Sequence, residues 1–156
     1  MVVDAGALKA EFLHSLKTEQ LVITPHPGEA ATLLACSPAE IQADRLDACN
    51  RLVETFASTC VLKGSGSLIG IQGAIPTLNA TGNPGMASAG MGDVLSGIIA
   101  AMLGQGLTPF EAAKSAVFIH GLCAEYACTE QDQTGLIASD VIRQIPAVIK
   151  NLRDAD

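Results

Sequence analysis

NATGNPGMASAGMGDVLSGIIAAMLGQGL, residues 79–107, is the stretch of sequence that decides the fold. Seven of the chain's 15 glycines lie within residues 82–106. Asp93 is the only charged residue of the stretch, and Lys63 is likewise isolated, with no other basic residue between positions 51 and 114. A charge that stands alone in an apolar, glycine-rich background indicates a specific task, so both side chains are candidate site residues.

Asp93 is expected at or just inside the N-terminus of a helix. Gly90 and Gly92 lead into an apolar run, residues 94–103, that has helical spacing and contains no proline. Backbone N–H groups at a helix N-terminus lack intrahelical partners, and the helix dipole favours negative charge there. The pattern predicts an anion site beside a carboxylate, which suits a phosphate next to a hydroxyl that is being deprotonated. The alternative is that Asp93 is a simple helix cap without a catalytic role.

Composition predicts one domain with a substantial core. The chain has 156 residues, of which 49% are hydrophobic and 16% are charged, as in a largely buried α/β sheet. A net charge of −7 and the absence of tryptophan disfavour a nucleic-acid surface, an anionic membrane surface and base-stacking platforms. An anionic nucleotide must then be held locally, by helix N-termini, backbone amides and a basic group such as Lys63.

The five cysteines indicate a reducing compartment. They form an odd set without a C-x-x-C pair, which favours buried, reduced thiols in the cytoplasm over a metal or disulfide framework. The apolar run at 94–103 has about half the length of a membrane span.

Hydrophobic periodicity and turn residues predict alternating strands and helices. The chain starts in a strand that turns at Gly6. Further strands are expected at 21–24, 60–63, 68–71 and 74–78, and helices at 8–16, from about 29, 38–57, 94–103, 108–127 and 140–152, the last capped by Ser139 and kinked by Pro146. This order predicts a three-layer α/β fold with a mainly parallel central sheet.

Two histidines receive different predictions. His26 lies between Pro25 and Pro27 at the carboxyl end of a strand, where α/β sheets bind ligands. His120 lies on the apolar face of the 108–127 helix and is expected to be a core histidine rather than a catalyst.

The segment KGSGS, residues 63–67, predicts a flexible loop between two strands. It is not a Walker motif, because in that motif the lysine follows the glycines. Taken alone, it fits a hairpin loop that carries a surface lysine better than it fits a nucleotide site.

Three segments together resemble the NAD(P)H-hydrate dehydratases of the ribokinase-like superfamily: TPHPGEAATLL (24–34), KGSGS (63–67) and TGNPGMASAGMGDVLSGIIAAMLGQGL (81–107). The resemblance implies that Asp93 faces the hydrated nicotinamide ring as general base and that His26 contacts the same substrate. It implies that Gly92 contacts the nucleotide and that the following residues bind its adenylate portion: Lys63, Gly64, Ser65, Gly66 and Ser67. Asp4 matches an acidic strand-end motif of the family, but Gly6 replaces the second acid, so only a weak role is carried onto Asp4.

The reaction implied by the resemblance is the nucleotide-dependent dehydration of hydrated NADH or NADPH, a metabolite-repair lyase activity. It uses ADP or ATP as co-substrate and implies Mg²⁺, for which the sequence identifies no ligands. Phosphorylation of the ring hydroxyl followed by loss of phosphate is a plausible route.

The resemblance covers essentially all 156 residues but only the later part of the family's catalytic domain. Residues 1–156 are therefore expected to form a partial domain that lacks its N-terminal strands, and to associate as a homo-oligomer or with the missing half. Two alternatives stay open: a small-molecule kinase of the same superfamily, and a truncated nucleotide-binding module without turnover.

Overall fold

The structure is a computed structural model that describes residues 1–18 and 20–155. Its five-stranded sheet has the order β1 (Val2–Val3), β2 (Val22–Ile23), β3 (Thr59–Leu62), β4 (Leu68–Gly70) and β5 (Thr77–Leu78). Strands β1, β2 and β3 are parallel, whereas β3, β4 and β5 form an antiparallel meander. The sheet is thus mixed rather than mainly parallel, because the short loop at 63–67 leaves no room for the crossover that parallel strands need.

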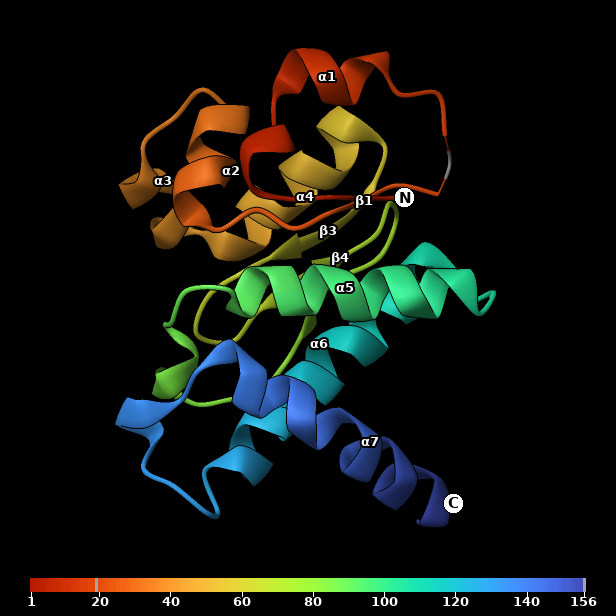
Figure 1. The fold of residues 1–156 in the computed structure, drawn as a ribbon. Helices are drawn as coiled ribbons and strands as arrows, with labels where there is room; N and C mark the ends of the chain where they lie inside the picture. The colour runs from red at the N-terminus through yellow and green to blue at the C-terminus, as the bar shows by residue number, and fades with distance from the viewer. Residues whose placement is uncertain (19, 156) are drawn as a thin grey trace.

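Helices cover both faces of this sheet, which confirms the layered α/β fold. Figure 1 shows the first four helices (red to yellow) on one side of the sheet and the last three (green to blue) on the other. The helices are α1 (Ala10–Ser15), α2 (Pro27–Leu33), α3 (Pro38–Ala43), α4 (Arg45–Phe56), α5 (Met91–Gly104), α6 (Pro109–Ala127) and α7 (Ala138–Asp154), with 3₁₀ turns at Ala5–Ala7, Pro84–Met86 and Gln133–Gly135.

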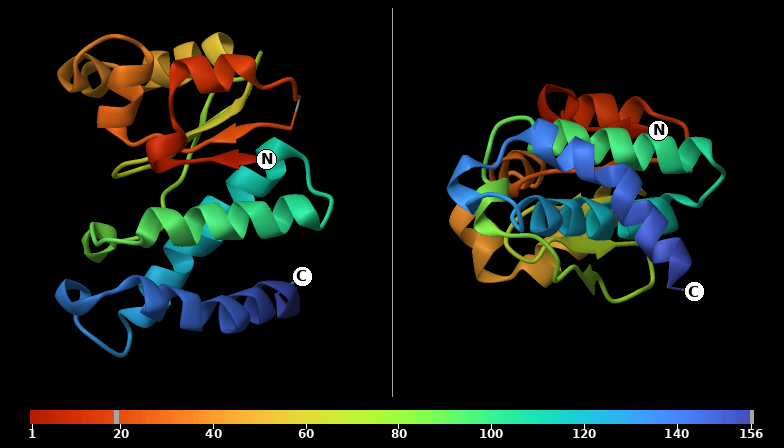
Figure 2. Two further views of the ribbon diagram at one scale, coloured as in Figure 1. Left: turned by 45° about the horizontal axis from the view of Figure 1, so that its top comes forward. Right: turned by 60° about the horizontal axis from the view of Figure 1, so that its bottom comes forward.

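Alternation along the strands assigns side chains to the two faces. Ile23 and Leu62 pack in a core with α1–α4, while their neighbours Val22 and Val61 pack in a second core with α5 and α6. A third cluster joins α6 to α7, so α7 forms an outer layer on α5 and α6 (Figure 2). The described part of the chain contains no helix that is both long enough and apolar enough to span a bilayer.

The prediction of one helix over 38–57 is wrong in one respect, because these residues form two helices that are separated at Asp44. Helix α3 ends at Ala43 and α4 begins at Arg45. The Asp44 backbone leaves the helical region, with φ −143° and ψ 86°, and its carboxylate accepts a hydrogen bond from the Asp47 N–H at 2.9 Å. A local side-chain cap therefore replaces helical continuity at this point.

Two other helix starts also differ from prediction. Helix α2 starts at Pro27 with His26 as its cap, and not from about Glu29. Helix α7 starts at Ala138, so Ser139 is not its cap; the Asp140 carboxylate instead accepts from the Ile137 N–H at 3.0 Å. Capping boxes start α3 at Ser37 and α6 at Thr108. The expected position of Asp93 in the first turn of its helix is confirmed.

Candidate functional site

The carboxyl ends of the three parallel strands meet the N-terminus of α5. Asp4, His26 and Lys63 follow β1, β2 and β3 respectively, so the parallel arrangement brings them to one edge of the sheet. A Cβ atom at Gly92 would lie 3.4 Å from Lys63 Nζ and 3.5 Å from Asp4 Oδ2. A residue without a side chain at the first turn of α5 therefore lets these two charged groups approach the helix end.

Lys63 and Asp4 form the central ion pair of the site. Lys63 Nζ lies 2.8 Å from Asp4 Oδ1, and the two side chains are only 19% and 13% exposed. Asp4 Oδ2 also accepts a hydrogen bond from Ser96 Oγ at 3.0 Å. Burial acts to raise the pKa of Asp4, but the hydrogen bonds and charge of Lys63 and the other donors outweigh it and hold the pKa below its usual value. Asp4 is therefore ionised. Its role in the site is larger than the sequence indicated.

Glu29 adds a second carboxylate near Lys63. Its Oε2 atom lies 3.8 Å from Lys63 Nζ and accepts a hydrogen bond from the backbone N–H of His26 at 2.7 Å. His26 Nδ1 accepts from the N–H groups of Gly28 and Glu29, at 3.0 and 3.2 Å. Because Nδ1 is occupied as an acceptor, a neutral His26 carries its proton on Nε2 and can offer a ligand only that N–H.

The loop at 63–67 forms one wall of a cavity of about 840 Å³. Gly66 has φ +68°, a left-handed conformation that favours glycine, and Ser67 Oγ donates to the Gly64 carbonyl at 3.2 Å. The rest of the lining comes from residues 78–84 and 86–88, from the start of α5 and from α6. The cavity brings together seven of the residues predicted from sequence: His26, Lys63, Gly64, Ser65, Gly66, Ser67 and Gly92.

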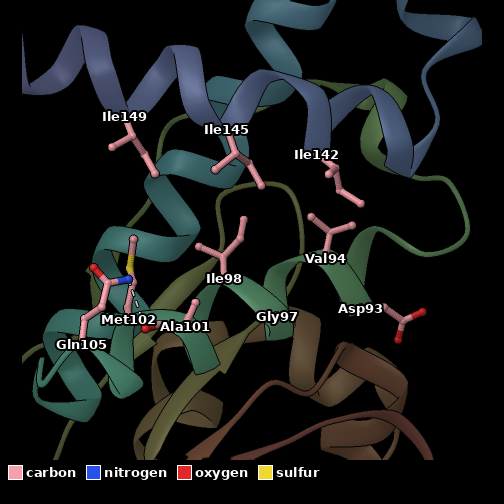
Figure 3. A pocket seen from close by; sticks show the side chains of 10 residues that line it. All are labelled: Asp93, Val94, Gly97, Ile98, Ala101, Met102, Gln105, Ile142, Ile145 and Ile149. Atoms are coloured by element: carbon pink, nitrogen blue, oxygen red, sulfur yellow. Dashed lines mark hydrogen bonds between the residues drawn. The ribbon is translucent and has the colours of Figure 1, made fainter.

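Asp93 does not line this cavity. It is exposed and lies at one end of a separate groove of about 480 Å³ between α5 and α7 (Figure 3). Consecutive residues of a helix point about 100° apart, so Gly92 and Asp93 face different sides of α5. The groove is otherwise almost entirely apolar, lined by Val94, Gly97, Ile98, Ala101, Met102, Gln105, Ile142, Ile145 and Ile149.

Residues 79–84 of the cavity lining were not identified as site residues from the sequence. Thr81 Oγ1 donates to the Phe118 carbonyl at 3.0 Å, and the Gly82 N–H donates to Glu125 Oε1 at 2.7 Å. These bonds fasten the 79–86 segment to α6. The segment carries no charge, and only its asparagines and glycines suggested a specific backbone path.

His120 also lines the cavity and is 6% exposed, as expected for a core histidine. Burial lowers its pKa to about 4, against a smaller opposing effect of the Met91 backbone. The imidazole is therefore neutral near pH 7.

The site has the chemistry to hold a polyphosphate. Lys63, the glycine-rich loop and the N-terminus of α5 supply positive charge and backbone donors. The described residues contain no group of three or more histidine, cysteine or acidic side chains placed to hold a metal. Asp4 and Glu29 fit Mg²⁺ in another way, because this ion is commonly held by one or two carboxylates while phosphates and water complete its shell.

Comparison with known proteins identifies the family of this chain. A family described as NAD(P)H-hydrate dehydratase matches residues 1–147. The bifunctional NAD(P)H-hydrate repair enzyme Nnr of Escherichia coli is 43% identical over 149 residues, which are 96% of this chain and 29% of that protein.

Two solved structures share the fold. The ADP/ATP-dependent NAD(P)H-hydrate dehydratase of Bacillus subtilis, co-crystallised with ATP and Mg²⁺, has a TM-score of 0.88 and 32% identity, covering 96% of this chain and 55% of that one. A ribokinase-like superfamily protein of Enterococcus faecalis has a TM-score of 0.82 and 29% identity, covering 96% and 52%. The chain thus spans less than a third of the Escherichia coli relative and about half of each solved structure, and it belongs to the NAD(P)H-hydrate dehydratase family.

Proposed function

We propose that this chain is the nucleotide-binding part of a dehydratase that repairs hydrated NADH or NADPH at the expense of ADP or ATP. One observation carries the proposal: the 63–67 loop, His26 and the N-terminus of α5 line a single cavity beside the Lys63–Asp4 ion pair. Its volume of about 840 Å³ lies in the range of small-molecule and cofactor sites.

The phosphates of the nucleotide belong beside Lys63 and the first turn of α5. Lys63 offers an ammonium group, and the first turn of α5 offers backbone N–H donors to the transferring phosphoryl group. Asp4 and Glu29 would hold Mg²⁺ through their oxygens, and the ion when bound supplies positive charge to the phosphates. The residues after Lys63 would contact the adenylate portion, and His26 would donate its Nε2–H to the nicotinamide side.

Asp93 is the proposed general base. It would accept the proton of the ring hydroxyl while that oxygen attacks the terminal phosphoryl group of ADP or ATP, which releases AMP or ADP. The ring would then lose phosphate together with a proton from the neighbouring carbon, which forms the ring double bond. Asp93 lies beside Gly92 but on another side of α5, so the ring would meet it at the edge of the nucleotide cavity.

We expect Asp93→Asn in a complete dehydratase domain to bind ADP normally and to lose about 10²–10⁴-fold in turnover, the usual contribution of a general base. Turnover is measured on hydrated NADH and ADP affinity by calorimetry. Asp47→Asn, an exposed acid on α4, is the matched control and should keep full activity. A rate near that of wild type for Asp93→Asn excludes the general-base role.

The position of Asp93 also favours a second candidate, a nucleotide-binding module without turnover. Asp93 faces an exposed apolar groove, which is an incomplete setting for catalysis by this segment alone. Dehydration of hydrated NADH by the complete domain would support the first candidate, whereas ADP binding without dehydration by that domain would support the second. A kinase of the same superfamily would instead phosphorylate a stable alcohol, so hydrated NADH is assayed against such alcohols.

We further infer that residues 1–156 form part of a domain, act in the cytoplasm and associate with another chain. All five cysteines are free thiols, which suits a reducing compartment. Strand β1 pairs only with β2 in the described sheet, and the apolar α5–α7 groove lies open. An unpaired edge and an exposed apolar groove both favour association.

A further inference from the structure

Arg45 makes two hydrogen bonds to the loop that lines the cavity. Its Nη1 donates to the Ser65 carbonyl at 2.7 Å, and its Nη2 donates to the Leu62 carbonyl at 3.2 Å. These two carbonyls flank Lys63 and Gly64. One guanidinium group therefore joins the backbone on both sides of the residues proposed to contact the nucleotide.

The role of Arg45 in its own helix does not explain its position. It is the first residue of α4, and a positive charge at a helix N-terminus opposes the helix dipole. Its Nε atom is also buried without a hydrogen-bond partner. Such costs indicate that the interaction that retains Arg45 lies elsewhere, at the loop.

Close packing against Gly64 strengthens this assignment. A Cβ atom at Gly64 would lie 2.9 Å from Arg45 Nη2, so the guanidinium rests directly on the loop backbone. From the other side, the Lys63 N–H donates to the Pro25 carbonyl at 2.8 Å. The start of the loop is thus held between α4 and the chain that follows β2.

We propose that Arg45 is the positioning residue of the 63–67 loop and that it sets nucleotide affinity without touching the nucleotide. The proposal rests on the proposed function of that loop. The break between α3 and α4 at Asp44 contributes to this positioning, because α4 then begins where the Arg45 side chain can reach the loop.

The geometry requires a guanidinium rather than a positive charge alone. Arginine presents several donors in a rigid fork and can bond two separate carbonyls, whereas the lysine ammonium is a single point on a flexible stem. Arg45→Lys should therefore restore only part of what Arg45→Ala removes.

The test compares Arg45→Ala, Arg45→Lys and Arg51→Ala in this chain. Arg51 lies on the same helix and is exposed, with its Nη1 3.7 Å from Asp47 Oδ2, so it controls for loss of an arginine from α4. ADP affinity is measured by calorimetry, and amide hydrogen exchange is followed in peptides that contain residues 63–67, β3 or α4.

We expect Arg45→Ala to weaken ADP binding by about tenfold or more, as for loss of charge-assisted hydrogen bonds, and to accelerate exchange selectively at 63–67. Arg45→Lys should be intermediate and Arg51→Ala unchanged. The proposal is overturned if Arg45→Ala leaves loop exchange unaltered, or if exchange rises equally in α4 and β3, since that pattern indicates a merely structural role. If wild type fails to bind ADP, the proposed function fails, while the exchange comparison still decides the role of Arg45.

Discussion

Lys63 is the residue on which the charge balance of the site depends. Its ammonium lies between two carboxylates, 2.8 Å from Asp4 Oδ1 and 3.8 Å from Glu29 Oε2. With both acids ionised, this group carries a net negative charge, so a polyphosphate alone would meet repulsion there. A divalent cation removes that conflict, which gives a physical reason for the requirement for Mg²⁺ implied by the family.

His120 links a single residue to the pH dependence of stability. Its folded-state pKa of about 4 lies below its usual value of 6.5. Between these two values the unfolded chain binds a proton that the folded chain does not, so the free energy of unfolding falls as pH falls from 6.5 to about 4. Above pH 6.5 the contribution of His120 to the free energy of unfolding has its full value.

We therefore expect His120→Gln to flatten the stability profile between pH 6.5 and 4, removing a difference of about 3 kcal/mol. The measurement is urea unfolding at several pH values for wild type and variant. His14→Gln, a change at an exposed histidine on α1, should keep the wild-type slope. A slope unchanged in His120→Gln would show that His120 titrates normally in the folded protein.

Sequence could predict which residues matter at this scale better than where they point. Isolated charge and motif resemblance identified Lys63, Gly92 and Asp93, and the structure brings Lys63 to the N-terminus of α5 from the end of β3. The sequence did not predict that Gly92 and Asp93 face different sides of α5. A motif gives the spacing of residues along the chain but not the side of the helix that each residue faces. The strong part played by Asp4 depends on a partner 59 positions away, which local patterns do not contain.

At the scale of elements, helix α4 supports the sheet through a close contact with β4. A Cβ atom added at Gly70 would lie 2.7 Å from Cys49 Sγ and 3.0 Å from Val53 Cγ2. Both α4 side chains are buried in the core on that face of the sheet. The glycine in β4 is therefore required by packing and not by backbone conformation.

We expect Gly70→Ala to destabilise the fold by about 1–3 kcal/mol, because an extra methyl group overpacks the contact between α4 and β4. Gly97→Ala on α5 is the matched control, since a Cβ there meets nothing within 4 Å. That change should stabilise by about 0.5–1 kcal/mol through helix propensity. Chemical denaturation of both variants gives the two signs, and a neutral Gly70→Ala would contradict the tight contact.

Element boundaries were predictable where a capping residue stood beside a proline. Ser37 and Thr108 each precede a proline and a glutamate three positions on, and both helices start there. Asp44 gave no such signal, because an acid among polar residues also fits the solvated face of one long helix. Only the bond from the Asp47 N–H distinguishes the two cases, and it depends on the backbone leaving the helix.

At the scale of the whole molecule, the layers follow from the sequence while the open surfaces do not. Strands that are apolar on both sides predict helices on both faces of the sheet, as the two cores on either side of it confirm. A hydrophobic residue on a helix could equally face a core or a partner. Ile142 and Ile145 lie three positions apart on α7, yet they line an open groove (Figure 3).

This groove makes association the last expectation to test. Ile142 is 52% exposed and stands on α7 opposite the apolar side of α5. Helix α5 in turn contacts the edge strand β1, which has one neighbour in the described sheet. We expect light scattering to detect dimers or larger species of the isolated chain, and Ile142→Lys to shift it towards monomer by placing a charge in the contact. Ile75→Lys is the control, because Ile75 is 87% exposed in the loop between β4 and β5, far along the sheet from β1. If the wild-type chain is monomeric at all concentrations, association is contradicted. If both variants lose association equally, the contact does not lie in the groove.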